Sequence, residues 1–365
     1  METRADALPL VTVIMPVRNE AGFIERSLGA VLAQDYPIDH IEVVLADGRS
    51  QDGTKEVIKR MLRRRWAEAA TACRARLSRK PLANLYPSLV ILDNPSEIAP
   101  AGLNAAIRRA RGDIVIRVDG HTLLGPDYVR RCVESLMEHD VECVGGAVDS
   151  VGVGYIGRAT ALAMSSPFGV GGSRFRVADS NSTPSLTDTV PFPAFRQSVF
   201  SSVGLFNEAM VRHQDYEFNY RVRKAGGRIL LLPSVRAKYY VRSTLKQLLA
   251  QYWQYGVWKG RFLGAHPDSL KLRHLIPASF TFTISAGAVG CLLLSSLLWP
   301  TAAALAAYLV FLLVASVLCA KGGLKYAPIL PAVLACMHLS YGAGVWMGLL
   351  SFVSDQARTK AQAAT

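Results

Sequence analysis

Cysteine is scarce in this 365-residue chain and follows no recognisable pattern. Its six cysteines are scattered, and no two of them form a Cys-x-x-Cys pair. This argues against a disulfide scaffold or a zinc ribbon and fits a reducing compartment. Glycine-rich phosphate loops are missing too: no Gly-x-Gly-x-x-Gly directly follows the first apolar run, and Gly-x4-Gly-Lys-Ser/Thr occurs nowhere. These absences argue against a dinucleotide oxidoreductase and a P-loop nucleotidase.

Charged residues are almost absent from the last quarter of the chain. Residues 275–365 contain four basic residues and one acid, which leaves 37 basic and 27 acidic residues in 1–274. Three runs there, 277–299, 301–320 and 326–353, contain no charged side chain. Each is long enough to cross a hydrocarbon core of about 30 Å at about 1.5 Å per residue. We predict three transmembrane helices, and the prolines and glycines of the third run allow a kink or a re-entrant path.

The chain begins without the pattern of a signal peptide. Acids occur within 1–9, and the apolar stretch 10–17 is short and strand-like. Basic residues precede the first predicted span and lie between the second and third, whereas the turn between the first and second has no charge. The positive-inside rule then predicts residues 1–274 in the cytoplasm and the short tail outside.

Strand-like and helix-like segments alternate in the first part of the chain. The expected strands are 11–15, 41–46, 89–92 and 114–118, and the expected helices are 21–34, 54–65 and 101–110. Such alternation predicts an α/β fold with a mostly parallel sheet and helices on both faces. Ligands of these sheets bind beyond the carboxyl ends of the strands. The polar residues at those ends are Arg18, Asn19, Glu20, Asp47, Asp119 and His121.

Four short motifs follow one another in order: PVRNE at 16–20, DGRSQDGT at 47–54, VDGH at 118–121 and HQDYEF at 213–218. As an ordered set over about residues 10–260, they resemble family 2 glycosyltransferases. The stretches 94–107, 110–121, 189–208 and 338–348 look like the bacterial exopolysaccharide glucosyltransferases of the succinoglycan-biosynthesis type. The resemblance implies a GT-A fold, a nucleotide-diphosphate-sugar donor, inversion at the anomeric carbon, and a membrane-bound enzyme that acts on lipid-linked sugars.

The resemblance also implies a donor nucleotide site at the strand ends. Asp47 would accept a hydrogen bond from a uracil N–H or a ribose hydroxyl, although an aspartate before glycine also suits a turn. Glu20 is a possible ribose contact or a helix cap, and Asp52 fits a cap for the helix that follows it. The implied donor-binding residues are Pro16, Arg18, Glu20, Asp47, Asn104 and Asp119.

Asp119 and His121 form an Asp-x-His triplet where most family members have Asp-x-Asp. In the family a divalent cation, Mg²⁺ or Mn²⁺, joins this position to the donor diphosphate and stabilises the leaving group. Asp119 is therefore the implied metal ligand. His121 is a candidate second ligand, which would favour tolerance of Mn²⁺. A contact with phosphate, or a structural role in the turn, remains an alternative for His121.

Asp215 matches the catalytic base of the family. An inverting transfer needs a carboxylate that removes the proton from the acceptor hydroxyl as it attacks the anomeric carbon. The family often has Glu-Asp here, whereas this chain has Gln214-Asp215, so Asp215 is the expected base and Glu217 is at most secondary. A position in the first turn of a helix is compatible with this role.

Two further segments are candidates for acceptor contacts. The stretch 171–193 is long for a connection in a compact domain, so we expect a functional or mobile loop, although a solvated loop fits as well. The stretch 243–263 is amphipathic and aromatic, which predicts an interfacial helix, with a core helix as the alternative. It lacks the Arg-Trp of the QxxRW motif found in processive relatives. The candidate acceptor or phosphate contacts are Arg174, Arg176, Gln214, Trp253 and Trp258.

Residues 59–80 hold nine basic side chains and one acid. A solvated helix face explains them, and attraction to anionic lipid headgroups is the alternative. No recognition motif for nucleic acid accompanies this charge, so we expect no nucleic-acid partner.

Together these observations predict four regions: a cytoplasmic GT-A domain (1–242), an amphipathic interfacial helix and linker (243–274), three transmembrane helices (275–354) and a short tail (355–365). The expected activity is the inverting, metal-dependent transfer of a hexose, glucose from UDP-glucose, to a polyprenyl-diphosphate-linked saccharide at the inner (plasma) membrane. A polyprenyl-phosphate sugar synthase and a non-catalytic membrane scaffold are the alternatives. Its expected partners are the donor, the polyprenyl-linked acceptor and membrane lipids.

Overall fold

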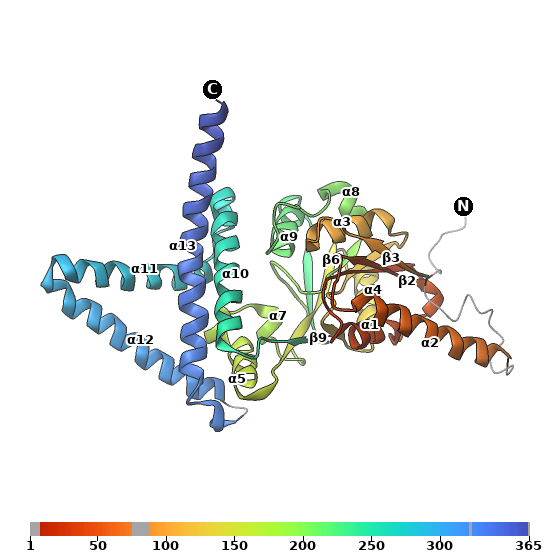
Figure 1. Ribbon diagram of the computed structural model, residues 1–365, viewed down its shortest axis with the longest axis horizontal. Coiled ribbons are helices and arrows are strands. Elements are labelled where there is room, and N and C mark those ends of the chain that lie inside the picture. Colours follow the sequence, from red (N-terminus) through yellow and green to blue (C-terminus); the bar gives the residue numbers. More distant parts are fainter. Residues whose placement is uncertain (1–7, 75–87, 321–322, 364–365) are drawn as a thin grey trace. The chain divides into compact units, whose positions relative to one another are not determined.

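The computed structural model describes residues 8–74, 88–320 and 323–363, and the chain divides into two compact units (Figure 1). The first comprises Met1–Asp149 and Ala178–Tyr239, and the second comprises Ser150–Val177 and Tyr240–Thr365. Within the predicted basic segment, residues 75–80 lie outside the described residues. The domain boundaries that we predicted at residues 242, 274 and 354 remain predictions.

One sheet forms the centre of the first unit, with strand order β3-β2-β1-β4-β8-β6-β9-β5. Strand β1 pairs in parallel with β2 and β4, and β2 pairs in parallel with β3. Four pairs are antiparallel: β4 with β8, β6 with β8, β5 with β9 and β7 with β9. The strands are β1 (Val11–Val17), β2 (Ile41–Asp47), β3 (Ser88–Asp93), β4 (Ile114–Arg117), β5 (Thr122–Leu124), β6 (Cys143–Val151), β7 (Ser185–Leu186), β8 (Ala194–Arg196) and β9 (Ile229–Tyr240).

The predicted α/β fold is confirmed, and all four predicted strands occur within one or two residues of their expected positions. The sheet is mixed because β8 runs opposite to β4, and the later pairs, β6 with β8 and β5 with β9, are antiparallel as well. Strands β1 and β2 are almost entirely buried, which explains their continuous apolar sequences.

Helices cover both faces of this sheet (Figure 1). In α1, Ile24, Leu28 and Val31 form one fully buried stripe at helical spacing. Helix α3 has a proline in its first turn, where the missing N–H leaves no helical bond unmade. The helices of this unit are α1 (Ile24–Leu32), α2 (Thr54–Arg74), α3 (Ala99–Arg109), α4 (Tyr128–Glu138), α8 (Ser198–Val203) and α9 (Gln214–Lys224).

The second unit is helical. Three of its helical segments, Leu272–Leu293, Ser295–Cys319 and Leu330–Thr359, are long and apolar enough to cross a membrane. The third predicted run is one uninterrupted helix from residue 330, with Pro331 in its first turn, whereas residues 326–329 lie in a 3-10 helix and a turn before it. The helices of this unit are α5 (Gly154–Met164), α6 (Pro167–Val170), α7 (Arg174–Val177), α10 (Leu245–Ala265), α11 (Leu272–Leu293), α12 (Leu298–Cys319) and α13 (Leu330–Ala363).

His338 is a polar side chain within the apolar part of α13, and both of its ring nitrogens have hydrogen-bond partners in the second unit. Its Nε2 lies 2.7 Å from the carbonyl oxygen of Phe168, and its Nδ1 lies 3.1 Å from the hydroxyl of Tyr308 on α12. This histidine therefore contacts neighbouring helices, which removes the cost of an unpaired polar group in an apolar setting.

Candidate active site at the carboxyl edge of the parallel strands

The carboxyl ends of β1, β2 and β4 meet at one edge of the sheet. The register pairs Val17 with Asp47 and Ile14 with Arg117. The residues that follow these strands therefore lie side by side, although they come from distant parts of the sequence. The sequence places its first three motifs at this edge.

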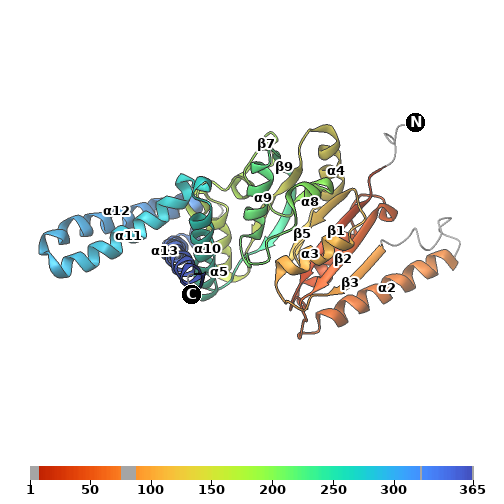
Figure 2. The same ribbon diagram turned by 90° about the horizontal axis from the view of Figure 1, so that it is seen from above.

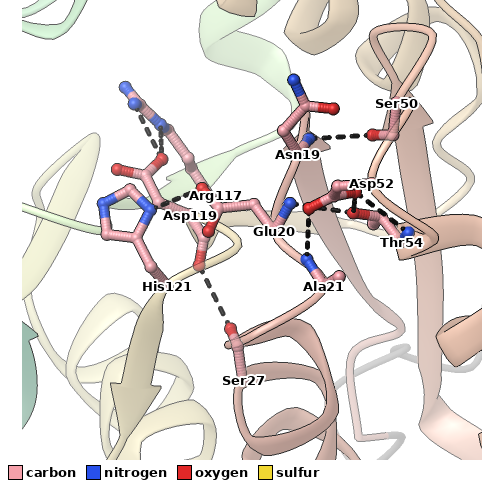
Figure 3. Close-up of polar contacts among 10 residues, drawn as sticks. All are labelled: Asn19, Glu20, Ala21, Ser27, Ser50, Asp52, Thr54, Arg117, Asp119 and His121. Carbon is pink, nitrogen blue, oxygen red and sulfur yellow. Dashed lines mark hydrogen bonds and ion pairs between the residues drawn. The ribbon is translucent and has the colours of Figure 1, made fainter.

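The loop after β1 is tied to the loop after β2 by backbone donors (Figure 3). Asn19 has a left-handed φ of 54°, a conformation that asparagine tolerates better than most residues. Its N–H donates to the Ser50 hydroxyl at 2.9 Å, and the Glu20 N–H donates to the Thr54 hydroxyl at 2.8 Å. These bonds hold the PVRNE motif against the DGRSQDGT motif.

Asp52 supports the same junction. One carboxylate oxygen accepts from the backbone N–H of Thr54 at 3.1 Å, and the other accepts from the N–H of Ala21 at 2.9 Å. The first of these bonds forms a turn that leads into α2, where Gly53 rather than Asp52 is the residue directly before the helix, and the second fixes the loop that precedes α1. Asp52 is thus a structural residue of the site.

Asp47 is completely buried at the end of β2. Its Oδ2 accepts from the backbone N–H of Ser50 at 3.1 Å and pairs with Lys55 Nζ at 3.0 Å. Burial raises the pKa of the carboxyl, but the hydrogen bonds from Ser50 and Lys55 outweigh it, and the pKa lies below its usual value. The other oxygen, Oδ1, has no hydrogen-bond partner among the described residues. An ionised, buried carboxylate with one unused acceptor suits a ligand N–H or hydroxyl.

Arg117 joins the two carboxylates that the sequence assigns to chemistry. It is the last residue of β4 and only 5% exposed. Its Nε and Nη2 donate to Oδ1 of Asp119 at 3.1 and 2.9 Å, and its Nη1 forms an ion pair with Asp215. Sequence reasoning missed Arg117 because it read 114–118 as an apolar strand. The signal was an arginine within an otherwise apolar, β-branched run.

Asp119 is held in its charged form. Burial raises its pKa, but the positive charges of Arg117, His121 and Arg212 outweigh this effect, so the pKa lies below the usual value. A quarter of its side chain remains exposed. Arg212 is a second residue that sequence reasoning missed, and it adds positive charge where a diphosphate would bind.

His121 turns towards Glu20, as Figure 3 shows, with its Nδ1 2.8 Å from Oε1 of that carboxylate. Gly120 permits this approach, because a Cβ at that position would lie 2.9 Å from Cγ of Glu20. The triplet Asp-Gly-His therefore packs directly against the motif PVRNE. His121 also contacts the ring of Tyr239, with 5.8 Å between the centroids.

These groups fit a divalent cation that takes most of its ligands from a nucleotide. Among the described residues, no cluster of three His, Cys, Asp or Glu side chains is arranged to hold a metal. Asp119 is nevertheless ionised and partly exposed, and His121 stands two residues away. Magnesium commonly binds through one or two carboxylates together with substrate phosphates. The donor set therefore suits a metal–diphosphate complex better than a metal held by protein alone.

Asp215 lies in the first turn of α9, with 38% of its side chain exposed. Behind it, Phe218 is fully buried and stacks on Phe206 with 4.5 Å between the centroids. Glu217 pairs with Arg221 at 2.6 Å, and that arginine also donates to two backbone carbonyls. Glu217 therefore supports the fold, and Asp215 is the exposed carboxylate of this turn. Gln214, beside it, is mostly buried.

Some implied donor residues have other partners. The side-chain amide of Asn104 donates to the Phe206 carbonyl and to Glu208, and its oxygen accepts from the Phe206 N–H. These bonds hold α3 against the segment after α8, so we do not include Asn104 among the proposed donor contacts. Arg18 forms an ion pair with Glu97 at the exposed rim, and Pro16 is part of β1.

The remaining candidate acceptor contacts belong to the second unit. Arg174 and Arg176 lie on α7, where the Arg176 guanidinium stands 5.4 Å from the centre of the Phe175 ring. Trp253 and Trp258 lie on α10. The stretch 171–193 contains α7 and β7 rather than a single irregular loop. The acceptor roles of these residues stay predictions.

Family models match the chain over the region that carries these motifs. A model described as Glycosyl transferase family 2 matches residues 12–70, and one described as Glycosyltransferase like family 2 matches residues 86–256. The succinoglycan biosynthesis protein ExoA of Rhizobium meliloti (strain 1021) is 30% identical over 343 residues, which cover 93% of this chain and 95% of that protein.

A more distant relative and a solved structure agree with this. The dolichyl N-acetyl-alpha-D-glucosaminyl phosphate 3-beta-D-2,3-diacetamido-2,3-dideoxy-beta-D-glucuronosyltransferase of Methanococcus voltae is 24% identical over 75% of this chain and 79% of its own length. The mannosyltransferase PcManGT from Pyrobaculum calidifontis, solved with GDP-Man and Mn²⁺, aligns with a TM-score of 0.52 at 22% identity, covering 96% of this chain and 88% of that chain. This likeness shows the fold, which is GT-A.

Proposed function

The chain belongs to family 2 of the glycosyltransferases, and we propose that it is an inverting hexosyltransferase that moves glucose from UDP-glucose to a polyprenyl-diphosphate-linked saccharide. The observation that carries the proposal is the bridge formed by Arg117 between Asp119 and Asp215. Such a bridge would hold the carboxylate of the donor side and the carboxylate of the acceptor side in one fixed relation.

Asp47 would bind the nucleoside. Its unused Oδ1 is an acceptor for the imide N–H of a uracil or for a ribose hydroxyl, and both are donors. Lys55 keeps this carboxylate ionised, so the bond to the ligand would be charge-assisted. Arg18 and Glu20 would flank the ribose and the phosphates.

Asp119 would hold a divalent cation, Mg²⁺ or Mn²⁺, with His121 as the candidate second ligand. When bound, the cation would neutralise charge on the donor diphosphate and make the nucleoside diphosphate a better leaving group. The mannosyltransferase of Pyrobaculum calidifontis was solved with Mn²⁺ and a nucleotide sugar, which supports this assignment by analogy. Arg117 and Arg212 would add fixed positive charge beside the diphosphate.

Asp215 would act as the general base. It would take the proton from the acceptor hydroxyl while that oxygen attacks the anomeric carbon on the face opposite the diphosphate, which inverts the configuration. Arg117 would position Asp215 through their ion pair. The side chain is more than one-third exposed, so an acceptor hydroxyl has access to it.

The lipid-linked acceptor is supported by the apolar helices of the second unit and by the relatives. One relative is named for succinoglycan biosynthesis, and another is named as a transferase acting on a dolichyl-phosphate-linked sugar. We place the catalytic unit at the cytoplasmic face of the inner membrane, where basic residues flank the predicted spans. The incomplete QxxRW motif at 251–255 favours the transfer of a single sugar over processive synthesis.

The decisive experiment offers radiolabelled UDP-sugars, one at a time, to purified protein with lipid extracts of the host membrane. We expect label from UDP-glucose in a lipid product whose mass equals a polyprenyl-diphosphate saccharide plus one hexose. A product with the mass of polyprenyl-phosphate-hexose would instead identify a polyprenyl-phosphate sugar synthase. No lipid product with any donor would favour the scaffold alternative and overturn the proposal.

A further inference from the structure

Two helices of the second unit, α10 and α13, pack backbone against backbone. Glycines permit this contact: a methyl group at Gly256 of α10 would overlap the carbonyl oxygen of Tyr341, and one at Gly260 would overlap that of Val345. On the facing side, a methyl group at Gly344 would lie 2.5 Å from the carbonyl oxygen of Trp253. Such close approach is possible only for small residues, and it fixes the two helices to each other.

The register shows that α10 and α13 run in the same direction. The carbonyl oxygen of Leu245, at the start of α10, lies 3.7 Å from Sγ of Cys336. Gly256 packs on Gly344 and Gly260 on Gly348. Near the end of α10, Arg261 pairs with Asp355 at 2.7 Å. Residue numbers rise together along both helices, so the pair is parallel.

This direction restricts how the chain can cross a membrane. Successive spanning helices alternate in direction, and α10 and α13 are separated by two helices, α11 and α12. If all four crossed, α10 and α13 would therefore run antiparallel, contrary to the register. Helix α10 packs along α13 from Leu245 to Arg261. If α13 crossed the membrane, α10 would therefore lie beside α13 in the hydrocarbon. Its charged residues Lys246, Lys259 and Arg261 would lie there too. Charged side chains at that depth are costly.

The α11–α12 hairpin has the opposite character. Its two helices pack against each other through Gly287 and Thr301, and through Phe280 and Tyr308 with 4.2 Å between the ring centroids. No Asp, Glu, Lys or Arg occurs from 274 to 320. Large apolar side chains near its tip are exposed: Leu292 by 85%, Leu293 by 81% and Trp299 by 79%. Exposure on this scale indicates contact with lipid.

The hairpin is also long enough to cross, and it is directed away from the pair. Each of its helices has 22 residues, or about 33 Å at about 1.5 Å per residue, against a hydrocarbon core of about 30 Å. Figures 1 and 2 both show the hairpin leaving the α10–α13 pair sideways, across the direction of the pair. If the hairpin axis follows the membrane normal, the plane of the membrane is therefore parallel to the axis of the α10–α13 pair.

We propose that the α11–α12 hairpin crosses the bilayer and that the α10–α13 pair lies along the membrane surface. The polypeptide would then enter and leave the membrane on one side, and the carboxyl end of α13 would lie on the same side as the catalytic unit. This replaces the three crossings and the outside tail that we expected from hydropathy. The pair combines charged residues with exposed Trp253, Trp346 and Leu350, a composition that suits the headgroup region.

The charges in the last turns of α13 support this topology independently. Arg358 and Lys360 follow the apolar part of α13, with Asp355 as the only acid. Three crossings would place these basic residues outside, against the positive-inside rule, whereas two crossings place them with Lys271, Arg273 and Lys325 on the cytoplasmic side.

Cysteine labelling with a membrane-impermeant maleimide tests the proposal in the full chain. Gln356→Cys reports on the tail, Ser296→Cys on the hairpin tip, and Glu138→Cys on the first unit; all three positions are exposed. In intact spheroplasts we expect labelling of Ser296→Cys alone, with the other two labelled only after permeabilisation. The unaltered chain gives the background from native cysteines. Labelling of Gln356→Cys in intact spheroplasts, or its absence at Ser296→Cys, would overturn the proposal.

A crosslinking experiment tests the parallel register itself. The double variant Arg261→Cys with Asp355→Cys should form a disulfide when isolated membranes are treated with a mild oxidant, because the two native side chains are in contact. The single variant Arg261→Cys is the matched control: an antiparallel pair would bring position 261 towards native Cys336 at the other end of the contact. A crosslink between 261 and Cys336, without one between 261 and 355, would contradict the arrangement.

Discussion

Strand β2 carries a buried carboxylate near each end, and the two have different surroundings. At the amino end, Glu42 accepts from the Thr12 hydroxyl at 2.8 Å, from the backbone N–H of Arg111 at 3.0 Å and from Nε of Arg111 at 2.8 Å. At the carboxyl end, Asp47 leaves one oxygen without a partner among the described residues. Both side chains are inaccessible to water in the absence of a ligand.

The difference separates the part of the sheet that holds the fold from the part that we propose to bind the donor. Bonds to both of its oxygens make Glu42 a junction between β1, β2 and the turn before β4. An unused buried acceptor costs stability, and a fold keeps it only where something else is gained. Changes at the carboxyl edge should therefore alter activity or binding, whereas changes at the amino edge should alter stability.

The largest expected effect is at Asp215. Asp215→Asn removes the proposed base while keeping its shape, so turnover should fall by about 10²- to 10⁴-fold, with UDP affinity and Tm nearly unchanged. Glu138→Gln, at an exposed position at the end of α4, is the matched control and should retain full turnover. Turnover and UDP binding are measured on the same detergent preparation. Normal turnover in Asp215→Asn would refute the mechanism.

Removal of divalent cations should reduce turnover through Asp119 at the carboxyl edge of the sheet. Excess chelator should abolish turnover, because the diphosphate leaving group would lose its neutralising charge, and added Mn²⁺ or Mg²⁺ should restore it. The Tm of the protein without nucleotide should stay nearly constant, since Arg117 already binds Asp119 without the cation. Full activity in excess chelator would remove the role assigned to Asp119.

Arg117→Lys should have an intermediate effect. A lysine retains one charge but lacks the planar fork that reaches both carboxylates, so turnover should fall by about 10- to 100-fold. Loss of the close guanidinium should also raise the pKa of Asp119, which that positive charge lowers, and the acid limb of the pH–rate profile should move to higher pH. A lower rate with an unshifted profile would indicate a merely structural role.

Asp47→Asn should weaken donor binding more than it affects catalysis. Loss of a charge-assisted bond should raise the Kd for UDP by about tenfold, which corresponds to about 1.4 kcal/mol, as measured by calorimetry. Tm should fall less than in Glu42→Gln, because only one of the two Asp47 oxygens has partners within the protein. A large loss of stability with unchanged UDP affinity would reverse the comparison between the two ends of β2.

Glu42→Gln should have the smallest effect on activity and a clear effect on stability. A glutamine cannot accept all three bonds, so unfolding should become easier by about 1–3 kcal/mol, with UDP affinity unchanged. Burial raises the pKa of Glu42, but its hydrogen bonds from Arg111 and Thr12 outweigh this and lower it. Its stabilising effect is therefore present above the unfolded pKa of about 4.3 and is lost as pH falls through the lower folded value. The Tm of the variant should depend less on acid pH.

Several features were predictable because they depend on local sequence patterns. The strands at 11–15, 41–46 and 114–118, the helix at 101–110 and the long apolar helices follow from periodicity and run length, and each occurs. The motifs also indicated that Asp52 would lie in the loop before α2. They named Asp47, Asp119 and Asp215 as candidates, and the roles of these three residues stay predictions.

Other features depend on contacts between distant segments. Arg117 reads as one residue of a strand, and only the packing of α9 against the sheet brings Asp215 to its guanidinium. Asn104 reads as a candidate donor contact, yet its amide is engaged by the segment at 206–208. The antiparallel half of the sheet was not expected, because its short strands carry weak patterns.

The sequence by itself determined the family, the α/β class, the candidate carboxylates and the helices apolar enough for a membrane, because each is encoded in neighbouring residues or ordered motifs. Only the tertiary structure decided which buried carboxylate has an unused oxygen, which arginine links the two sides of the site, and that α10 and α13 run parallel. Those properties depend on which distant groups meet. The length of an apolar run indicates whether a helix can span a membrane, whereas its packing shows in which direction it runs relative to its neighbour.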